Sequence, residues 1–548
     1  MLSEQESTID YNVIISIDFG STFSGCSYAI KGTQEVFDIT KWPKYMGFYG
    51  KVPTLLYYKT KTKRLMDWGN GARLLSFKPK QDGELVQNFK MWLADENIME
   101  KQEYVVETIS DYLNKFHEHI LDELEKKLDL QYTPDQYCYC ITVPAIWSDQ
   151  AKALMREACV KAGIVHHRDP LDRLTLISEP EAAALYCERK CDISNLKHDD
   201  KFMIIDAGGG TVDLIIYQVH QPNASKPRTL KEVTSGYGGV CGSSDIDKNL
   251  RKLLLDKIGP EGELIPQCTL EMIMETFIEY IKPVFNGDED QYLDIPATAL
   301  PYLPEGLLND DSQLVLKARE LDEKVFRPVF KSVISLINKQ INQGNIQIKT
   351  AFLVGGFGSS SYLYRTVEEA FHDKIQNCVS PPHAELAMVR GAVYHCLSPG
   401  LVTSKVARCT YGVRTRLVFE EGLDPESSAV ITSDGVKRCS TRFDVILTKG
   451  QRIRVGSKIR RSFWVTYPRH TEADLYVYHG DGPTPRQIFD AGVKKIADFP
   501  IKMPNLPGLV GGERVDVNIE FIFGLTELKI DVLVSGYRSQ FTTRINDD

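Results

Sequence analysis

The sequence contains VIISIDFGSTFSG at 13–25 and FMIIDAGGGTVDLIIYQV at 202–219, two stretches with the same local design. In each, a continuous apolar run leads to an aspartate, and a turn of small residues leads to a second run. Continuous apolar runs are typical of strands buried on both faces. Glycine lets the backbone N–H groups of a turn come close to an anion. The repeat therefore predicts two strand–turn–strand units whose turns together hold a polyphosphate.

Asp18 and Asp206 stand where the first strand of each unit ends. Mg²⁺ keeps several of its waters and takes few protein oxygens, so one carboxylate per turn suits it. The hydroxyl groups of Ser21, Thr22 and Thr211 lie beside these carboxylates in the sequence. A single match of this kind would favour an ordinary hairpin with glycine in its turn. Because the design occurs twice, we favour a magnesium–phosphate site.

A third glycine motif, LVGGFGSSSYL at 353–363, follows another buried run and precedes a helical segment. Main chain at such a junction can pass close to a nucleoside. A single glycine-rich string is weak evidence for a nucleotide site, since such strings also occur elsewhere, as in GYGGVCG at 236–242. The prediction of a nucleotide site therefore depends on the order of all three motifs. The GxxxxGK[ST] pattern is absent, which excludes the P-loop mechanism.

Length and composition limit the class of protein. A chain of 548 residues should form several compact units, and 43% hydrophobic with 25% charged residues is typical of a globular protein. The formal charge of −9 provides no cationic field for nucleic acid, which we exclude as a main partner. The sequence has neither an apolar run of about 18 residues nor a signal-like start. We expect a cytoplasmic protein without a membrane span.

The cysteine and histidine pairs offer an alternative, a metal centre, which we do not favour. The twelve cysteines lack paired spacing and are expected to be reduced. Cys138 and Cys140 lie in a strand-like run without a second pair of ligands nearby. His117 and His119 should point to different sides of a helix. We expect all four to be structural.

The pattern of elements changes along the chain. Up to about residue 400, buried strands alternate with helices, which is typical of a layered α/β protein. Strands are predicted at 13–17, 139–143, 202–205 and 351–354, and helices at 105–127 and 149–162, the latter between Ser148 as cap and Gly163 as end. The acidic stretch 286–313 lacks clear periodicity and is expected to be a surface insertion.

From about Ala407 onward, alternating segments predict a β-domain. Alternate residues from Val515 to Phe523 should lie on one face of a strand, and Gly524 should turn the chain into a hairpin partner at 528–534.

Further motifs give the chain a resemblance to a known family. They are ITVPAIWSDQAKALMREACVKAG (141–163), ISEPEAAALYC (177–187), FKMWL (89–93), VRGAVY (389–394) and CTYGV (409–413). Together with the two aspartate turns, they resemble the heat shock 70 kDa (DnaK-type) family, and most closely its atypical member-12 branch. The resemblance covers nearly the whole chain.

The resemblance implies a fold and a domain order. Residues 1–398 would form an actin-like (ribonuclease H-like) ATPase domain, with lobes at roughly 1–200 and 201–398 and ATP in the cleft. A linker at 399–406 would lead to an all-β sandwich-type domain at 407–548 for peptide or protein partners, without a helical lid. ATP or ADP and Mg²⁺ are the implied ligands.

The resemblance also assigns roles to residues. Asp18 and Asp206 match the aspartates that organise Mg²⁺. Lys90 matches a lysine that contacts phosphate, and Glu179 matches the carboxylate that positions the attacking water. Without the resemblance, Lys90 and Glu179 would be interpreted as surface charges. The phosphate turns correspond to Gly20, Ser21, Thr22, Phe23, Gly208, Gly209, Gly210 and Thr211.

The resemblance also implies that Gly355 and Gly356 lie beside the nucleoside and that Glu279 and Lys282 contact the ribose. Gly239 and Phe357 are further predicted cofactor contacts. The sequence departs from the family at the adenine pocket, where Pro283 and Ser359 replace two arginines. Lys152 replaces a switch arginine, whose planar fork of donors lysine does not reproduce.

Two functions follow from these observations. The first is an ATP-binding, chaperone-like protein with slow Mg²⁺-dependent hydrolysis, protein clients and possible co-chaperones. The alternative is an ATP-sensing adaptor with little or no hydrolysis, which the missing lid and the altered linker favour. Sugar kinases and filament formers of the actin fold are the remaining class, and the β-domain counts against a kinase.

Overall fold

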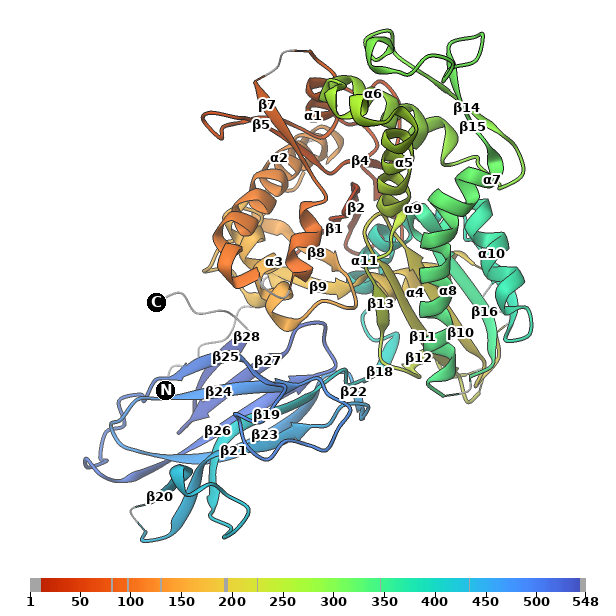
Figure 1. Ribbon diagram of the computed structural model, residues 1–548. Helices are drawn as coiled ribbons and strands as arrows, with labels where there is room; N and C mark the ends of the chain where they lie inside the picture. The colour runs from red at the N-terminus through yellow and green to blue at the C-terminus, as the bar shows by residue number, and fades with distance from the viewer. Residues whose placement is uncertain are drawn as a thin grey trace. The chain divides into compact units, whose positions relative to one another are not determined.

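The computed structural model describes residues 11–542, apart from 80–81, 96–97, 129–130, 192–195, 224, 345 and 433. It is a mixed α/β structure that divides into two compact units (Figure 1). Unit 1 comprises Met1–Ile146, Met155–Lys226 and Tyr237–Leu401. Unit 2 comprises Trp147–Leu154, Pro227–Gly236 and Val402–Asp548. The segments Trp147–Leu154 and Pro227–Gly236 thus group with the C-terminal part of the chain.

The first sheet of unit 1 contains the first predicted repeat. Its strand order is β3-β2-β1-β8-β9, with β4 beside β2. Strand β1 is antiparallel to β2 and parallel to β8, and all of its side chains are buried, which explains its continuous apolar sequence. The strands are β1 (Val13–Asp18), β2 (Phe23–Ile30), β3 (Phe37–Asp38), β4 (Lys51–Pro53), β8 (Tyr137–Val143) and β9 (Leu174–Ser178).

The second sheet of unit 1 contains the other repeat in the same arrangement. Strand β10 is antiparallel to β11 and parallel to β16, just as β1 is to β2 and β8. The prediction of two equivalent strand–turn–strand units is therefore confirmed. The strands, in sheet order, are β17 (Ile375–Val379), β16 (Ile348–Val354), β10 (Lys201–Ala207) and β11 (Val212–His220), with β13 (Tyr237–Gly239) beside β11.

Helices account for much of the rest of unit 1. The apolar stripe predicted for 105–127 is buried on α2, and Ile109, Leu113 and Phe116 are inaccessible to solvent. The helices are α1 (Gly69–Ser76), α2 (Gln102–Leu128), α4 (Glu179–Lys190), α5 (Ser243–Ile258), α6 (Gln267–Thr276), α7 (Ala318–Leu321), α8 (Arg327–Asn342), α9 (Gly355–Gly358), α10 (Ser361–Phe371) and α11 (Ala387–Leu397). Helix α8 lies against β11 (Figure 1).

Helix α3 (Asp149–Lys161) has the predicted ends. The Ser148 hydroxyl accepts a hydrogen bond from the Ala151 N–H at 3.1 Å, so it caps the first turn. The helix stops before Gly163, whose φ of +77° belongs to the left-handed region that favours glycine. Residues 149–154 of α3 belong to unit 2, and residues 155–161 belong to unit 1.

Helices α4 and α11 approach each other closely within unit 1. A Cβ atom added to Gly391 of α11 would lie 1.8 Å from the carbonyl oxygen of Ala182 in α4. The two backbones therefore meet without an intervening side chain, and glycine is required at this position for space rather than for its φ angle.

Two small sheets complete unit 1. The antiparallel strands β5 (Leu55–Lys59), β6 (Leu65–Trp68) and β7 (Gly83–Gln87) form one of them. The other pairs β14 (Gln291–Asp294) with β15 (Gln313–Leu316). The stretch 286–313, for which the sequence showed no clear periodicity, thus takes part in a two-stranded sheet.

Unit 2 is built mainly from two antiparallel sheets, drawn from cyan to blue in Figure 1. Side chains from both sheets form one apolar core, in which Leu475 contributes from one sheet and Val517 and Phe521 from the other. One sheet has the order β20 (Ala429–Ile431), β21 (Lys437–Leu447), β19 (Thr410–Val418), β24 (Thr471–Tyr478) and β25 (Val493–Ile501). The other has the order β23 (Ser457–Thr466), β26 (Arg514–Phe523), β27 (Lys529–Val534) and β28 (Tyr537–Thr542).

The predicted hairpin in this unit is confirmed. Strands β26 and β27 are antiparallel neighbours, and Gly524 between them has a φ of +86°. The predicted linker contains a strand, β18 (Val402–Val406), which pairs in parallel with β12 (Thr229–Glu232) and antiparallel with β22 (Arg452–Arg454). The Glu232 carboxylate accepts a hydrogen bond from the Val406 N–H at 2.8 Å.

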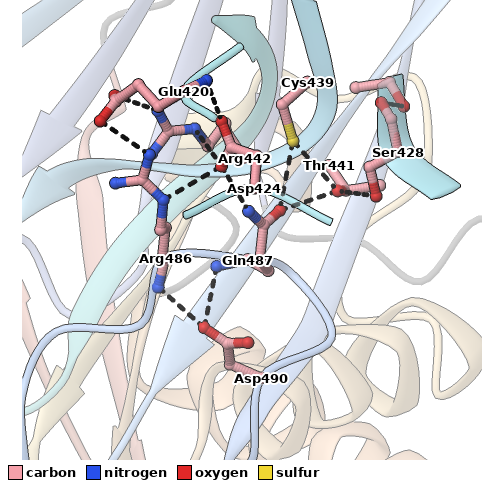
Figure 2. Close-up of polar contacts among 10 residues, drawn as sticks. Glu420, Asp424, Ser428, Cys439, Thr441, Arg442, Arg486, Gln487 and Asp490 are labelled. Carbon is pink, nitrogen blue, oxygen red and sulfur yellow. Dashed lines mark hydrogen bonds and ion pairs between the residues drawn. The ribbon is translucent and has the colours of Figure 1, made fainter. Parts of the chain in front are cut away.

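A polar cluster connects two loops of unit 2 (Figure 2). Its centre is Asp424, whose side chain is inaccessible to solvent. One carboxylate oxygen of Asp424 accepts hydrogen bonds from Arg486 Nε at 3.0 Å and Gln487 Nε2 at 2.9 Å, and it lies 3.1 Å from Arg442 Nε. The loop after β19 is thereby held to the loop after β24.

Further contacts extend this Asp424 cluster. The Asp490 carboxylate accepts hydrogen bonds from the backbone N–H groups of Arg486 and Gln487 at 2.8 and 2.9 Å. The Thr441 hydroxyl donates to Gln487 Oε1 at 2.8 Å, and Glu420 pairs with Arg442 (Figure 2). Sequence analysis did not predict this cluster.

Candidate functional site

The two predicted turns are in direct contact. A Cβ atom added to Gly209 would lie 2.3 Å from Thr22 Oγ1, and one added to Gly210 would lie 2.6 Å from Ser21 Oγ. Glycine is therefore required in the second turn because the first turn occupies the adjacent space. The structure brings the β1–β2 turn and the β10–β11 turn together, as the repeat predicts.

The second turn presents its backbone N–H groups on one side. The carbonyl oxygens of Gly208, Gly209 and Gly210 accept hydrogen bonds from the N–H groups of Ser243, Ser244 and Gly242, respectively, at the start of α5. In a trans peptide, the N–H group points away from the carbonyl of the same unit. The N–H groups of residues 209, 210 and 211 are thus directed away from α5. Successive N–H groups arranged in this way form an anion-binding concavity.

Four carboxylates and two lysine ammonium groups are buried beside the turns. When all are ionised, this set carries two negative charges, the charge that one divalent cation balances. Burial of unbalanced charge is costly, so such a set favours either a bound cation or proton uptake. The residues of this carboxylate–lysine cluster are Asp18, Glu179, Asp206, Asp213, Lys51 and Lys90.

The pKa values of the carboxylates reflect this balance. Burial raises the pKa of Asp206 well above its ordinary value, and the charges of Glu179, Asp213 and Asp18 add to the effect. Burial also raises the pKa of Glu179 to about 7, against the opposing effect of Lys90. Burial acts on Asp18 as well, but Lys51 and Lys90 outweigh it and lower the pKa of that carboxyl. The Asp206 side of the cluster is therefore the side that lacks positive charge.

Lys90 and Glu179 form a buried ion pair. Lys90 lies on the 3₁₀ helix η1 (Phe89–Ala94), and Glu179 is the first residue of α4. Their side chains are 4% and 8% exposed, and Lys90 Nζ lies 2.5 Å from Glu179 Oε1. The interpretation of these two residues as surface charges is therefore wrong.

Asp18 is held by two side chains. Its Oδ2 atom accepts a hydrogen bond from Lys51 Nζ at 2.7 Å, and its Oδ1 atom accepts one from Thr142 Oγ1 at 2.8 Å. Sequence analysis missed Lys51, although a lysine at the start of an apolar strand is rarely buried without a partner. Asp213 was also missed. Its position inside the apolar run VDLIIYQV is the corresponding signal.

Asp213 is the fourth carboxylate of the cluster. Its Oδ1 atom accepts a hydrogen bond from the Ile146 N–H at 3.2 Å. Its Oδ2 atom is buried and has no hydrogen-bond partner in the described part of the chain. An acceptor of this kind suits a hydrated cation, whose water molecules donate hydrogen bonds.

The third glycine motif lies against the Asp206 strand. Gly355 has a φ of +86°, and a Cβ atom added there would lie 2.7 Å from Asp206 Oδ1. Gly356 has open space around it. Phe357 is buried, with its ring centroid 6.1 Å from that of Phe330, so it contributes to the core of unit 1. Gly239 pairs with Val212 across β13 and β11.

Glu279 and Lys282 contact side chains outside the carboxylate–lysine cluster. Glu279 lies on the π-helix η7 (Phe277–Ile281) and is 3.2 Å from Arg73 Nη1. Lys282 follows this helix and pairs with Asp247 at 2.7 Å. The structure therefore places both residues in ion pairs, and their predicted contact with a ribose stays a prediction.

The residues beside the turns fit a hydrated cation better than an enclosed one. Across the described residues, no group of three or more His, Cys, Asp or Glu side chains is arranged to hold a metal ion. His117 instead makes a buried hydrogen bond with the Tyr139 hydroxyl at 2.9 Å. All twelve cysteines lie in the described ranges, and none forms a disulfide. None of the described helices combines the length and apolar character needed to cross a membrane.

Comparison with known proteins identifies relatives over almost the whole chain. The chain is 25% identical to "Heat shock 70 kDa protein 12A" of Homo sapiens, over 97% of this chain and 91% of the relative. It is also 25% identical to "Heat shock 70 kDa protein 12B" of Homo sapiens, over 96% and 90%. "Chaperone protein DnaK" of Thermotoga maritima is 20% identical, over 89% and 74%. No family model matches the chain. The alignments nonetheless run through both units, so the chain is similar over almost its whole length to the heat shock 70 kDa protein family, in its member-12 branch.

Proposed function

We propose that this protein is an ATP-binding, chaperone-like protein with slow Mg²⁺-dependent ATP hydrolysis. The observation that carries the proposal is the contact between the two glycine turns beside four buried carboxylates. Relatives named heat shock 70 kDa protein and chaperone protein DnaK support it, because they align over most of the chain.

The proposed domain roles follow the sequence. Residues 1–398 bind the nucleotide as an actin-like, two-lobed domain, and residues 399–406 link it to the β-domain. Residues 407–548 provide a surface for peptide or protein partners. The contiguous apolar core shared by the two sheets supports a β-domain that presents binding loops on a rigid scaffold.

Each group of the site has a proposed role in binding. The N–H groups of residues 209–211 and the hydroxyl groups of Ser21, Thr22 and Thr211 bind phosphate oxygens. Asp206 would accept hydrogen bonds from the water shell of a bound Mg²⁺. When bound, Mg²⁺ would neutralise charge on the phosphates.

The surroundings of Glu179 support slow hydrolysis. A carboxylate with a pKa of about 7 can accept a proton near neutral pH, as a group that positions the attacking water should. Lys90, however, holds this carboxylate at 2.5 Å in a buried ion pair. Before Glu179 can orient a water molecule, it has to loosen this contact, which adds to the barrier of the chemical step.

The alternative is an ATP-sensing adaptor that turns over little or no ATP. The same Lys90–Glu179 pair favours it, because a permanently paired Glu179 would leave no group to position the water. In that case the nucleotide sets the conformation of the protein without being consumed.

Calorimetry of Mg²⁺–ATP binding, followed by single-turnover hydrolysis on the same sample, distinguishes these functions. Asp206→Asn should abolish Mg²⁺-dependent binding while the fold persists, and Asp122→Asn, an exposed change of the same chemistry on α2, should not. Binding with measurable cleavage supports the chaperone-like ATPase, and binding without cleavage supports the adaptor. If Asp206→Asn gained as much ATP affinity from added Mg²⁺ as the wild type does, the metal role of Asp206 would be refuted.

A further inference from the structure

We propose that Lys51 is a built-in cation of the phosphate site, which pairs with the Oδ2 atom of Asp18 and lets the nucleotide bind with little dependence on Mg²⁺. This inference rests on the proposed nucleotide function and concerns the part that one residue plays in it. It starts from a side chain that neither the repeat nor the family resemblance predicts.

The fold directs Lys51 into the site. Lys51 begins β4 and lies opposite Gly25 of β2. A Cβ atom added to Gly25 would lie 3.2 Å from Lys51 Cγ and 3.7 Å from Lys51 Cε. The aliphatic stem of the lysine therefore crosses the space that glycine leaves open, and its residue is only 9% exposed. This packing fixes the ammonium group at the end of β1.

Both oxygens of Asp18 are already used. Lys51 Nζ lies 2.7 Å from Oδ2, and Thr142 Oγ1 lies 2.8 Å from Oδ1. A metal ion that took Asp18 as a ligand would lie beside a buried ammonium group, whose positive charge repels it. The role of Asp18 is then to anchor Lys51, and the predicted metal role stays with Asp206.

The chemistry of the ammonium group suits a phosphate. An ammonium group has three N–H donors, and within the described residues Lys51 uses one of them, on Asp18. The other donors are available to a phosphate oxygen at the turn. Because the lysine is covalently attached, its charge cannot be removed by a chelator, whereas that of Mg²⁺ can.

The net charge of the carboxylate–lysine cluster also indicates that Lys51 favours anion binding. With Lys51, the fully ionised carboxylate–lysine cluster carries two negative charges, and without Lys51 it would carry three. An added anion such as a nucleoside diphosphate is repelled more strongly in the second case. A hydrogen bond from a charged donor changes affinity by about 10- to 100-fold, which sets the size of the effect expected for Lys51.

The test is calorimetry of ADP binding to the full chain, once with Mg²⁺ and once with EDTA. We expect the wild-type affinity in EDTA to stay within about 10-fold of that with Mg²⁺, since the Lys51 charge remains. Lys51→Met should bind ADP at least about 10-fold more weakly in EDTA and recover part of the loss with Mg²⁺. Lys51→Arg, which keeps a positive charge, should lose less affinity in EDTA than Lys51→Met. Lys61→Met, a change of the same kind at an exposed turn, should match the wild type.

Several outcomes would overturn the proposal. The first is equal ADP affinity of Lys51→Met and the wild type in EDTA. The second is a wild-type ADP affinity that falls more than about 100-fold when Mg²⁺ is removed. Thermal unfolding shows whether Lys51→Met folds. If it does not fold, the second result still tests the proposal, because it uses only the wild-type protein. Absence of ADP binding by the wild type in both conditions would refute the proposed function itself and this inference with it. Mg²⁺-dependent wild-type binding would refute the inference alone.

Discussion

Glu179→Gln should change how the stability of unit 1 depends on pH. The folded protein holds Glu179 with a pKa of about 7, raised from an ordinary value of 4.5 chiefly by burial. Glutamine has nearly the same shape but does not ionise. The substitution therefore removes one titration from the folded state and leaves the packing of α4 almost unchanged.

The sign and the size follow from proton linkage. Because the folded pKa lies above the unfolded one, the folded state binds more protons between pH 4.5 and pH 7, and this contribution to stability is lost as the pH rises through about 7. The shift corresponds to about 3 kcal/mol in total, of which about 2.5 kcal/mol is lost between pH 5 and pH 8. The unfolding free energy of Glu179→Gln, relative to wild type, should therefore rise by about 2.5 kcal/mol from pH 5 to pH 8.

Urea denaturation at pH 5, 6, 7 and 8 measures this difference. Tryptophan fluorescence reports on unit 1 through Trp42, Trp68 and Trp92, which all lie in it. Glu118→Gln, at an exposed position of α2, is the control and should show no change with pH relative to wild type. A free-energy difference between Glu179→Gln and wild type that stays constant from pH 5 to pH 8 would refute the buried, proton-binding state of Glu179.

Two further predictions concern packing and the Asp424 cluster. Gly391→Ala should destabilise unit 1 by about 2 kcal/mol, because an overpacking cost of about 3 kcal/mol exceeds a gain of about 1 kcal/mol in helix propensity. Gly356→Ala, which meets no atom within 4 Å, is its control, and equal urea midpoints for the two variants would contradict the close contact of α4 with α11. Asp424→Ala should lower the unfolding free energy of unit 2 by about 1–3 kcal/mol, since it leaves donors of Arg486 and Gln487 without their acceptor. Asp481→Ala, at a carboxylate that is 91% exposed, should cost less than about 0.5 kcal/mol, and similar losses for both aspartates would contradict the role of Asp424.

The elements that sequence analysis predicted correctly have local signals. The β1–β2 and β10–β11 units are encoded within stretches of 13 and 18 residues, in which apolar runs, an aspartate and small residues follow directly on one another. The ends of α3 are equally local, because Ser148 and Gly163 act on the adjacent turns. Periodicity and capping are read over a few residues, so a single sequence suffices for them.

The missed features depend on partners far apart in the chain. Lys51 is 33 residues from Asp18, and nothing near it indicates that a carboxylate will neutralise it. The Asp424 cluster joins side chains from three separate segments, each of which is an ordinary polar loop or strand end by itself (Figure 2). Pairing of β18 with β12 likewise joins positions about 170 residues apart. Such contacts are decided by tertiary packing, which local sequence does not encode.

The close contact of α4 with α11 has a mechanical consequence for Glu179. This residue begins α4, and the backbone of α4 rests on Gly391 with no side chain between them that could change its rotamer. Glu179 is therefore held by a closely packed α-helix. Lys90 belongs to η1, a short 3₁₀ helix whose hydrogen-bond geometry is poorer than that of an α-helix. We therefore expect that Lys90, rather than Glu179, moves when this ion pair opens. A variant that stiffens η1 should accordingly slow the release of Glu179, while a change at Lys190, in the exposed last turn of α4, should leave it unchanged.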